Sequence, residues 1–96
     1  MKRYYVYITT NQHRTVLYTG VTGFLQRRMD QHWYDALFEG MHFTGRYQSF
    51  YLIYFEEYNH PDTAIAREKE IKGWRREKKL KLIRSSNPTL EFLPTG

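Results

Sequence analysis

The chain has 96 residues, a length that makes one domain with a modest core. A hydrophobic fraction of 41% with an aromatic fraction of 18% excludes a disordered chain, and the lack of cysteine excludes disulfides and thiolate metal sites. The formal net charge of +5 favours a polyanionic partner, which makes nucleic acid the first candidate.

The hydropathy of the sequence indicates whether the protein is expected in a membrane. No apolar stretch approaches the ~20 residues that cross a bilayer. The first residues lead directly into a strand pattern and show no apolar signal region. We therefore expect no membrane association and a cytoplasmic location, which the missing cysteines also fit.

Residues 3–10 and 16–21 have the composition of paired β-strands. In the first segment the side chains alternate, so that Tyr7 lies on the face opposite Val6. A polar turn joins the segments, which should form an antiparallel hairpin with Tyr7 and Tyr18 on neighbouring strands. Whether these two tyrosines share a face depends on the register of the strands.

A helix is predicted over residues 23–38, with Thr22 as its N-cap. Arg27 projects away from the apolar stripe of this helix, whereas Arg28 and His32 lie at its edge, one turn apart. The two adjacent arginines are therefore not equivalent. The residues of the stripe recur at helical spacing: Leu25, Met29, Trp33, Ala36 and Leu37.

The middle of the chain predicts a loop followed by a strand. Residues 39–49 carry two glycines and no hydrophobic period, which is typical of a loop. Residues 50–58 form a dense aromatic and aliphatic run, from which we expect a central strand buried on both faces.

Two helices are predicted in the last third of the chain. Pro61 marks the start of the first, which continues to about Trp74, and a strongly basic helix follows over residues 75–84. We expect residues 1–85 to form a single domain and residues 86–96 to form a C-terminal tail.

Glu68 stands out in the first of these two helices. In helical projection it falls between Ala64 and Ile71 on the apolar face, whereas Glu70 lies on the other side. A carboxylate on such a face costs several kcal/mol unless it pairs with a cation or binds a metal. Either an ion pair with a lysine or arginine across the core or a metal site would explain it.

Most of the positive charge is concentrated in the same part of the chain. Nine of the fifteen Lys and Arg lie between Arg67 and Arg84, where only three glutamates offset them. They form either a solvated helical face with i,i+4 pairs or a patch that contacts phosphates. The candidates for phosphate contact are Lys72, Arg75, Arg76, Lys78, Lys79 and Lys81.

The tripeptides Tyr5-Val6-Tyr7 and Tyr18-Thr19-Gly20 are followed by Arg28, eight residues past the glycine, and by a carboxylate on a later helix. In this order and spacing they resemble the GIY-YIG nuclease superfamily, and most closely its small, single-domain bacterial branch. The resemblance extends over residues 3–84. It implies an α/β fold of the α+β type, in which about three helices flank a three-stranded antiparallel sheet.

The resemblance also implies one active site that uses a single divalent ion, Mg²⁺ or Mn²⁺. His32 matches a position that is histidine in some members of the superfamily and not in others. The residues carried over by position are the motif tyrosines Tyr7 and Tyr18, the motif glycine Gly20, the motif arginine Arg28 and the metal ligand Glu68.

Each of these residue types suits phosphodiester hydrolysis. Glu68 would anchor a hard cation that prefers oxygen ligands and keeps most of its waters. Arg28 would bind the non-bridging phosphate oxygens with its planar, permanently charged fork. Tyr7 or Tyr18 would position or deprotonate the attacking water. Gly20 would let the backbone turn from strand to helix close to the phosphate.

Several of the same residues also have a purely structural interpretation. Tyr7 and Tyr18 could be cross-strand partners in the sheet. Arg28 could be a surface residue, and His32 could be a packing residue. Taken together with Glu68, the combination favours an active site.

Three positions depart from the superfamily pattern. Tyr5 replaces the glycine and Thr19 the isoleucine of the two motifs, both at positions that contribute backbone or packing. Several members place an asparagine after the metal glutamate, but Asn87 stands too far along the chain from Glu68 to be assigned to the site.

The sequence thus predicts a metal-dependent endonuclease that hydrolyses phosphodiester bonds in DNA, with branched, damaged or single-stranded DNA as candidate substrates. Its own basic helices would bind the substrate. Because they would contact phosphates, we expect low sequence selectivity. The alternatives are a non-catalytic nucleic-acid-binding module on the same scaffold and a domain that docks a DNA-repair partner. The intact motif residues favour catalysis.

Overall fold

The computed structural model describes residues 2–34 and 51–94, and over residues 32–34 it describes the helical backbone only. Three antiparallel strands form one sheet in the order β2-β1-β3. The prediction of a three-stranded antiparallel sheet and of an N-terminal hairpin is therefore confirmed. The strands are β1 (Tyr4–Thr10), β2 (Leu17–Thr22) and β3 (Tyr51–Tyr58).

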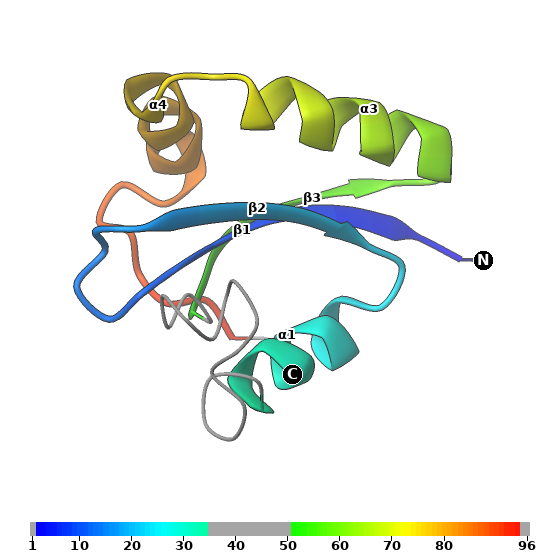
Figure 1. Cartoon of the computed structure of the whole chain (residues 1–96), viewed down its shortest axis with the longest axis horizontal. Coiled ribbons are helices and arrows are strands. Elements are labelled where there is room, and N and C mark those ends of the chain that lie inside the picture. The colour runs from blue at the N-terminus through cyan, green and yellow to red at the C-terminus, as the bar shows by residue number, and fades with distance from the viewer. Residues whose placement is uncertain (1, 35–50, 95–96) are drawn as a thin grey trace.

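Helices cover both faces of this sheet (Figure 1). One helix, α1 (Leu25–Tyr34), lies on one face, and two helices, α3 (Pro61–Lys72) and α4 (Arg76–Ser86), lie on the other. The helix α1 begins at Leu25, two residues later than predicted, and Thr22 is the last residue of β2 and not the N-cap. The Thr22 hydroxyl accepts a hydrogen bond from the Phe24 N–H at 3.1 Å, within the turn that leads into the helix. Among the described residues, no helix is both long and apolar enough to cross a membrane.

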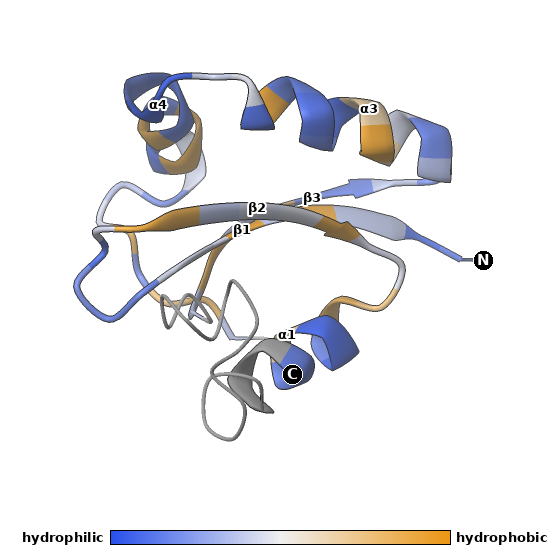
Figure 2. Cartoon of the chain, in the orientation of Figure 1, coloured by the Kyte–Doolittle hydropathy of each residue, from blue (hydrophilic) through white to orange (hydrophobic). Residues whose placement is uncertain are grey.

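The alternation of side chains along β1 divides the core into two layers. Val6 and Ile8 face α3 and α4, where they pack with Ile71 and Ile83. Tyr7 faces α1 and packs with buried Met29 and Leu52, the latter from β3. The hydropathy colouring shows apolar positions along the strands and on the sides of α3 and α4 that face them (Figure 2).

The prediction that residues 50–58 form the central strand is wrong. β1 is central, and β3 is an edge strand paired only with β1 in the described sheet. The first half of β3 is buried as expected, but Phe55 and Glu57 in its second half are exposed. The aromatic run has the composition of a doubly covered strand, but aromatic and β-branched side chains suit a half-covered edge as well.

The segment after α4 packs against the sheet as far as residue 94. The Leu93 N–H donates to the Leu52 carbonyl at 2.7 Å, next to the stacked rings of Tyr51 and Phe92. Buried Asn87 donates from its side-chain amide to the Ile53 carbonyl at 2.9 Å. This hydrogen bond attaches the C-terminal segment to β3, so the side chain of Asn87 has a structural role. The predicted loop 39–49 lies outside the described residues.

Candidate active site

Gly20 lies directly opposite Tyr7 in the β1–β2 ladder. The ring of Tyr7 crosses β2 at this point, and a Cβ atom on Gly20 would overlap the Tyr7 ring carbon Cζ and the hydroxyl oxygen. Gly20 is inside β2 and not at the strand-to-helix turn, so the role expected from the sequence is corrected. Because Gly20 has no side chain, the Tyr7 ring can lie across the strand at this position.

The register also decides the question of the two tyrosines. Tyr18 pairs with Thr9, which lies two residues from Tyr7 on β1 and therefore points to the same face. The ring centroids of Tyr7 and Tyr18 are 6.4 Å apart, with an angle of 37° between the ring planes. The two motif tyrosines are thus diagonal neighbours on the sheet face that carries α1.

Arg28 reaches these tyrosines from α1. Its Nε donates a hydrogen bond to the Tyr7 hydroxyl at 3.2 Å. The pKa of Arg28 is raised, mainly by this hydrogen bond and, with smaller effect, by the charge and hydrogen bonding of Tyr18, while burial opposes the rise. The helix that begins after Thr22 therefore brings the motif arginine to both motif tyrosines.

The remaining residue predicted on this helix is His32. Its backbone lies in α1, one turn after Arg28, as expected. Its side chain lies outside the described residues, so its part in the site stays a prediction.

Tyr7 is fully buried, and this burial is the main reason why its pKa is raised to about 12. The Arg28 guanidinium opposes the rise, and the charges of Tyr18 and Glu68 add to it. Tyr7 therefore stays protonated at neutral pH, and its hydroxyl oxygen accepts the hydrogen bond from Arg28. Glu68, on α3, has the smallest of these effects on the Tyr7 pKa.

Glu68 points from α3 into the fold, with 14% of its side chain exposed. Its Oε2 pairs with Lys72 Nζ at 3.0 Å, one turn along the same helix. One of the two explanations for a carboxylate on this face is thus present, although the cation comes from the same helix and not from across the core. Lys72 is half-exposed and can leave the pair without disturbing the core.

A single carboxylate provides few protein ligands for a metal ion. In residues 2–34 and 51–94, no three acidic or histidine side chains come together in a way that could hold a cation. Mg²⁺, however, is commonly bound through one or two carboxylates, while waters and substrate phosphates complete its shell. The mostly buried carboxylate of Glu68, which pairs with a half-exposed lysine, fits this mode of binding.

A pocket of about 290 Å³ lies beside the site, between β2 and the basic helices. It is lined by Tyr18, by neighbouring residues of β2, and by Lys72 and Lys79. Two of the predicted phosphate contacts therefore face the same pocket as a motif tyrosine. A phosphate in this pocket would meet positive charge on one side and the tyrosine on the other.

The other predicted phosphate contacts are less closely associated with the site. Arg76 donates to the Arg14 carbonyl at 3.1 Å and so holds the β1–β2 turn. Lys78 lies over the Trp74 ring at 4.3 Å from its centroid. Arg75 and Lys81 are exposed on the surface. These four could contact a long substrate, but they do not line the pocket beside Tyr18.

Sequence reasoning missed the surroundings of Phe24. This ring is exposed at the start of α1 and lines the same small pocket as Arg28. The signal was present in the sequence, because Phe24 is an aromatic residue at the start of the predicted helix that is not part of its apolar stripe.

The sequence model of the GIY-YIG catalytic domain matches residues 3–81 of this chain. The chain belongs to the GIY-YIG family. The matched residues include all three strands, α1 and α3, and therefore every residue that the site described above brings together. Proteins of this nuclease family generally use a divalent metal ion, and the domain implies binding of nucleic acid.

Similar proteins match this chain over most of their length. The chain is 37% identical over 79 residues to a UPF0213 protein of Haloquadratum walsbyi, covering 82% of this chain and 84% of the relative. It is 34% identical over 83 residues to a UPF0213 protein of Staphylococcus saprophyticus, covering 86% and 96%. These similarities describe a small, single-domain GIY-YIG protein.

A solved structure supports the same fold. The solution NMR structure of a UPF0213 protein from Bacillus halodurans superposes with a TM-score of 0.57 at 25% sequence identity. The superposition covers 91% of this chain and 88% of the other. The α+β fold expected from the family resemblance is therefore confirmed.

Proposed function

We propose that this protein is an endonuclease that hydrolyses phosphodiester bonds in DNA with the help of one divalent ion. The observation that carries the proposal is the convergence of Tyr7, Tyr18 and Arg28 on one sheet face, within the electrostatic influence of Glu68. A phosphate-cleaving site needs a cation for the phosphate oxygens, a group that handles the attacking water and a carboxylate for the metal. This cluster provides one candidate for each.

The two tyrosines have different environments, which supports different roles for them. Tyr7 is fully buried and its raised pKa of about 12 makes it a poor base. Its hydroxyl is held by the Arg28 side chain, so we assign Tyr7 the task of orienting that guanidinium. Tyr18 is only partly buried and lines an open pocket, so it is the tyrosine that can contact the attacking water.

Arg28 would bind the non-bridging oxygens of the scissile phosphate. Its side chain is exposed towards solvent on one side and fixed by Tyr7 on the other, so its position requires little reorganisation when the phosphate arrives. Glu68 would hold Mg²⁺ or Mn²⁺, and the bound ion would supply charge stabilisation for the leaving oxygen.

Lys72 has a place in this proposal. In the described structure it neutralises Glu68, and it also lines the pocket beside Tyr18. Binding of a cation by Glu68 would compete with the Lys72 ammonium. Once released, Lys72 would be free to contact a DNA phosphate in the pocket, together with Lys79.

The Glu68–Lys72 ion pair also supports a second candidate function. A carboxylate that is permanently neutralised by lysine binds no metal, and the protein would then be a nucleic-acid-binding module without turnover. The two candidates differ in what happens to Glu68 in the presence of a divalent cation.

A cleavage assay distinguishes them. Purified protein is incubated with supercoiled plasmid, single-stranded DNA and branched DNA in Mg²⁺, Mn²⁺ or EDTA. We expect cleavage that requires the cation and that Glu68→Gln abolishes, whereas Glu77→Gln, an exposed control on α4, retains it. If no substrate is cut in either cation while binding to DNA is unaffected by Glu68→Gln, the nuclease proposal fails and the binding module takes its place.

A further inference from the structure

Phe24 occupies an unusual position at the start of α1. Its side chain is 53% exposed, the largest exposure among the large hydrophobic residues of the described part of the chain. Two cations lie over this ring, with Lys2 Nζ at 4.8 Å and the Arg27 guanidinium carbon at 4.9 Å from the ring centroid. An exposed aromatic face bordered by two positive charges is a typical contact surface for single-stranded nucleic acid.

The ring is placed between two hollows of the surface. A smaller pocket of about 210 Å³ contains Phe24, Arg27 and the motif arginine Arg28. A larger one of about 670 Å³ contains Phe24 and Arg27 again, and continues to Tyr5 and Phe55 on the sheet. Because the two hollows share Phe24 and Arg27, a single surface leads from the candidate active site to the aromatic pair on β1 and β3.

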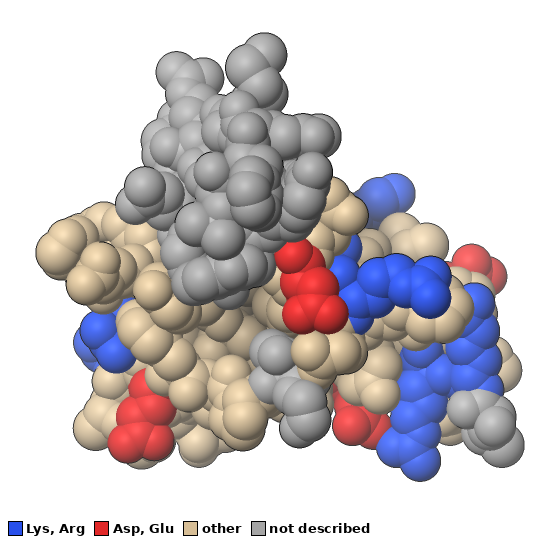
Figure 3. All heavy atoms as spheres, turned by 90° about the horizontal axis from the view of Figure 1, so that it is seen from below, with Lys and Arg blue, Asp and Glu red and all other residues tan. Residues whose placement is uncertain are grey.

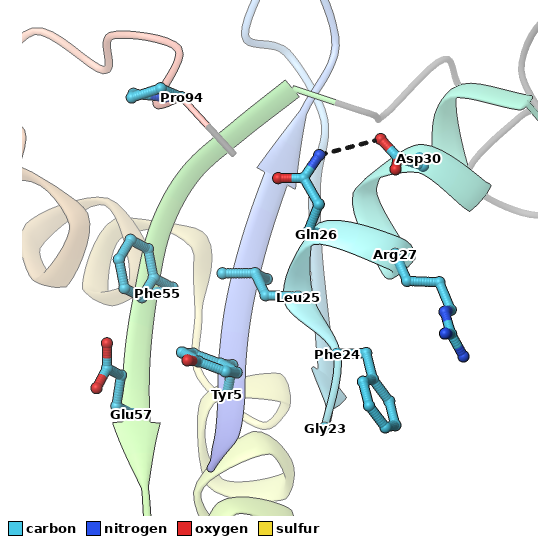
Figure 4. A pocket seen from close by; sticks show the side chains of 10 residues that line it. All are labelled: Tyr5, Gly23, Phe24, Leu25, Gln26, Arg27, Asp30, Phe55, Glu57 and Pro94. Atoms are coloured by element: carbon cyan, nitrogen blue, oxygen red, sulfur yellow. Dashed lines mark hydrogen bonds between the residues drawn. The ribbon is translucent and has the colours of Figure 1, made fainter. Parts of the chain in front are cut away.

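Figure 4 shows how the larger groove is built. Phe24 and Arg27 lie next to each other on the outer side of α1, and Leu25 points from the helix towards the sheet. Tyr5 and Phe55 stand side by side on the neighbouring strands, with ring centroids 6.1 Å apart in an edge-to-face arrangement. Phe55 is 39% exposed, so the groove offers a second accessible aromatic face.

We propose that this groove binds an unpaired nucleobase next to the scissile phosphate, with Phe24 as the stacking residue and Arg27 and Lys2 as contacts to the adjoining phosphates. The proposal rests on the nucleic-acid cleavage proposed above and specifies its substrate as DNA with at least one unpaired nucleotide beside the cut. A base inside a duplex is already stacked on both faces, so it cannot offer a face to Phe24 without being extruded.

Two acidic residues that line the groove, Asp30 and Glu57, agree with a base and not a phosphate beside them. Glu57 pairs with Arg3, and Asp30 accepts a hydrogen bond from the Gln26 amide at 3.3 Å. The Asp30 carboxylate would repel a phosphate, whereas a neutral base fits the apolar surface formed by Leu25, Tyr5 and Phe55. On this face of the molecule, Lys and Arg gather towards the end where the N-terminus lies (Figure 3). The phosphates would therefore follow the Arg27 and Lys2 side.

Binding of a fluorescein-labelled 12-nucleotide single strand and of the matched duplex is measured by anisotropy in EDTA, so that cleavage plays no part. We expect Phe24→Leu to weaken single-strand binding roughly 5- to 100-fold, as loss of one stacked base does, and to change duplex binding less than about twofold. Phe24→Trp should retain single-strand binding. Ile65→Ala is the control, because Ile65 is similarly exposed (41%) but lies on α3, across the sheet.

A second arm places one abasic nucleotide at each position of the strand in turn. We expect one position at which the missing base weakens binding to the native protein but causes no further loss in Phe24→Leu. Equal binding of the native protein and Phe24→Leu would overturn the proposal, and so would an equal loss on single strand and duplex. If the abasic position and Phe24→Leu show this dependence on each other but no cation supports cleavage, the proposal of a base-binding groove is supported and only the nuclease proposal fails.

Discussion

The Tyr7 ring lies across β2 at Gly20, where a methyl group on the glycine would overlap the ring and its hydroxyl. This relationship connects both motifs of the family in one contact, since Tyr7 belongs to the first tripeptide and Gly20 to the second. Because Arg28 is hydrogen-bonded to the same hydroxyl, the position of the guanidinium depends on the missing side chain of Gly20.

Gly20→Ala is therefore expected to displace the Tyr7 ring and the Arg28 guanidinium with it. A shift of about 1 Å in a positioned group can reduce the rate ~100-fold, and overpacking should lower the free energy of unfolding by about 1–3 kcal/mol. Cleavage rates and urea unfolding test both effects. Gly73→Ala is the matched control, since a methyl group there would meet backbone oxygens of α3 at 3.5 and 3.8 Å, an ordinary contact distance, and the backbone conformation suits alanine. Equal activity of both variants would contradict this role of Gly20.

Removing the cation that pairs with Glu68 should strengthen metal binding. In Lys72→Gln the carboxylate no longer has to exchange an ammonium group for a metal ion, so we expect about two- to fivefold tighter binding, the range that a partly exposed ion pair can account for. Calorimetric titration with Mn²⁺ measures this directly, independent of cleavage. Lys69→Gln, on the same helix but exposed, should leave the affinity unchanged. Weaker binding in Lys72→Gln would show that the lysine supports the ion.

The raised pKa of Tyr7 predicts a loss of stability at alkaline pH. A tyrosine with a pKa near 10 in the unfolded chain and about 12 in the folded protein releases its proton on unfolding. The contribution of Tyr7 to the free energy of unfolding is therefore fully present below pH 10 and is lost as the pH rises towards 12. In Tyr7→Phe the fall should be less steep by up to about 1.4 kcal/mol per pH unit. Urea unfolding at pH 8 to 11.5 tests this, and parallel curves for the two proteins would contradict it.

The ion pair between Glu56 on β3 and Arg67 on α3 should stabilise the fold without taking part in the chemistry. Arg67 donates from Nε and Nη2 to Glu56 at 2.9 and 3.1 Å, and the Tyr58 hydroxyl donates to the same carboxylate at 2.6 Å. Burial would raise the pKa of Glu56, but the hydrogen bonds from Arg67, Tyr54 and Tyr58 outweigh it and lower the pKa.

Arg67→Met is expected to lower the free energy of unfolding by roughly 1–3 kcal/mol, between the values for exposed and buried pairs. The activity of the protein that remains folded should be unchanged. Arg3→Gln breaks the exposed pair with Glu57 and should cost less than about 1 kcal/mol. A loss of cleavage by folded Arg67→Met would show that the pair also shapes the site.

The sequence by itself determined the elements and the set of chemically competent residues. Alternation along residues 3–10 and the proline at position 61 depend on local geometry, which neighbouring residues decide. The order and spacing of the motifs indicated the family before any contact was known. The apolar face of α3 identified Glu68 as a carboxylate that needs a partner.

Only the tertiary structure decided how these residues meet, because register, strand order and partners are set by contacts between distant segments. A shift of one residue would have turned Tyr18 away from Tyr7, and no local signal excludes it. The same holds for the position of β1 at the centre of the sheet and for Gly20 as the residue over which the Tyr7 ring lies. Each of these depends on which surfaces pack together, and packing is a property of the whole chain.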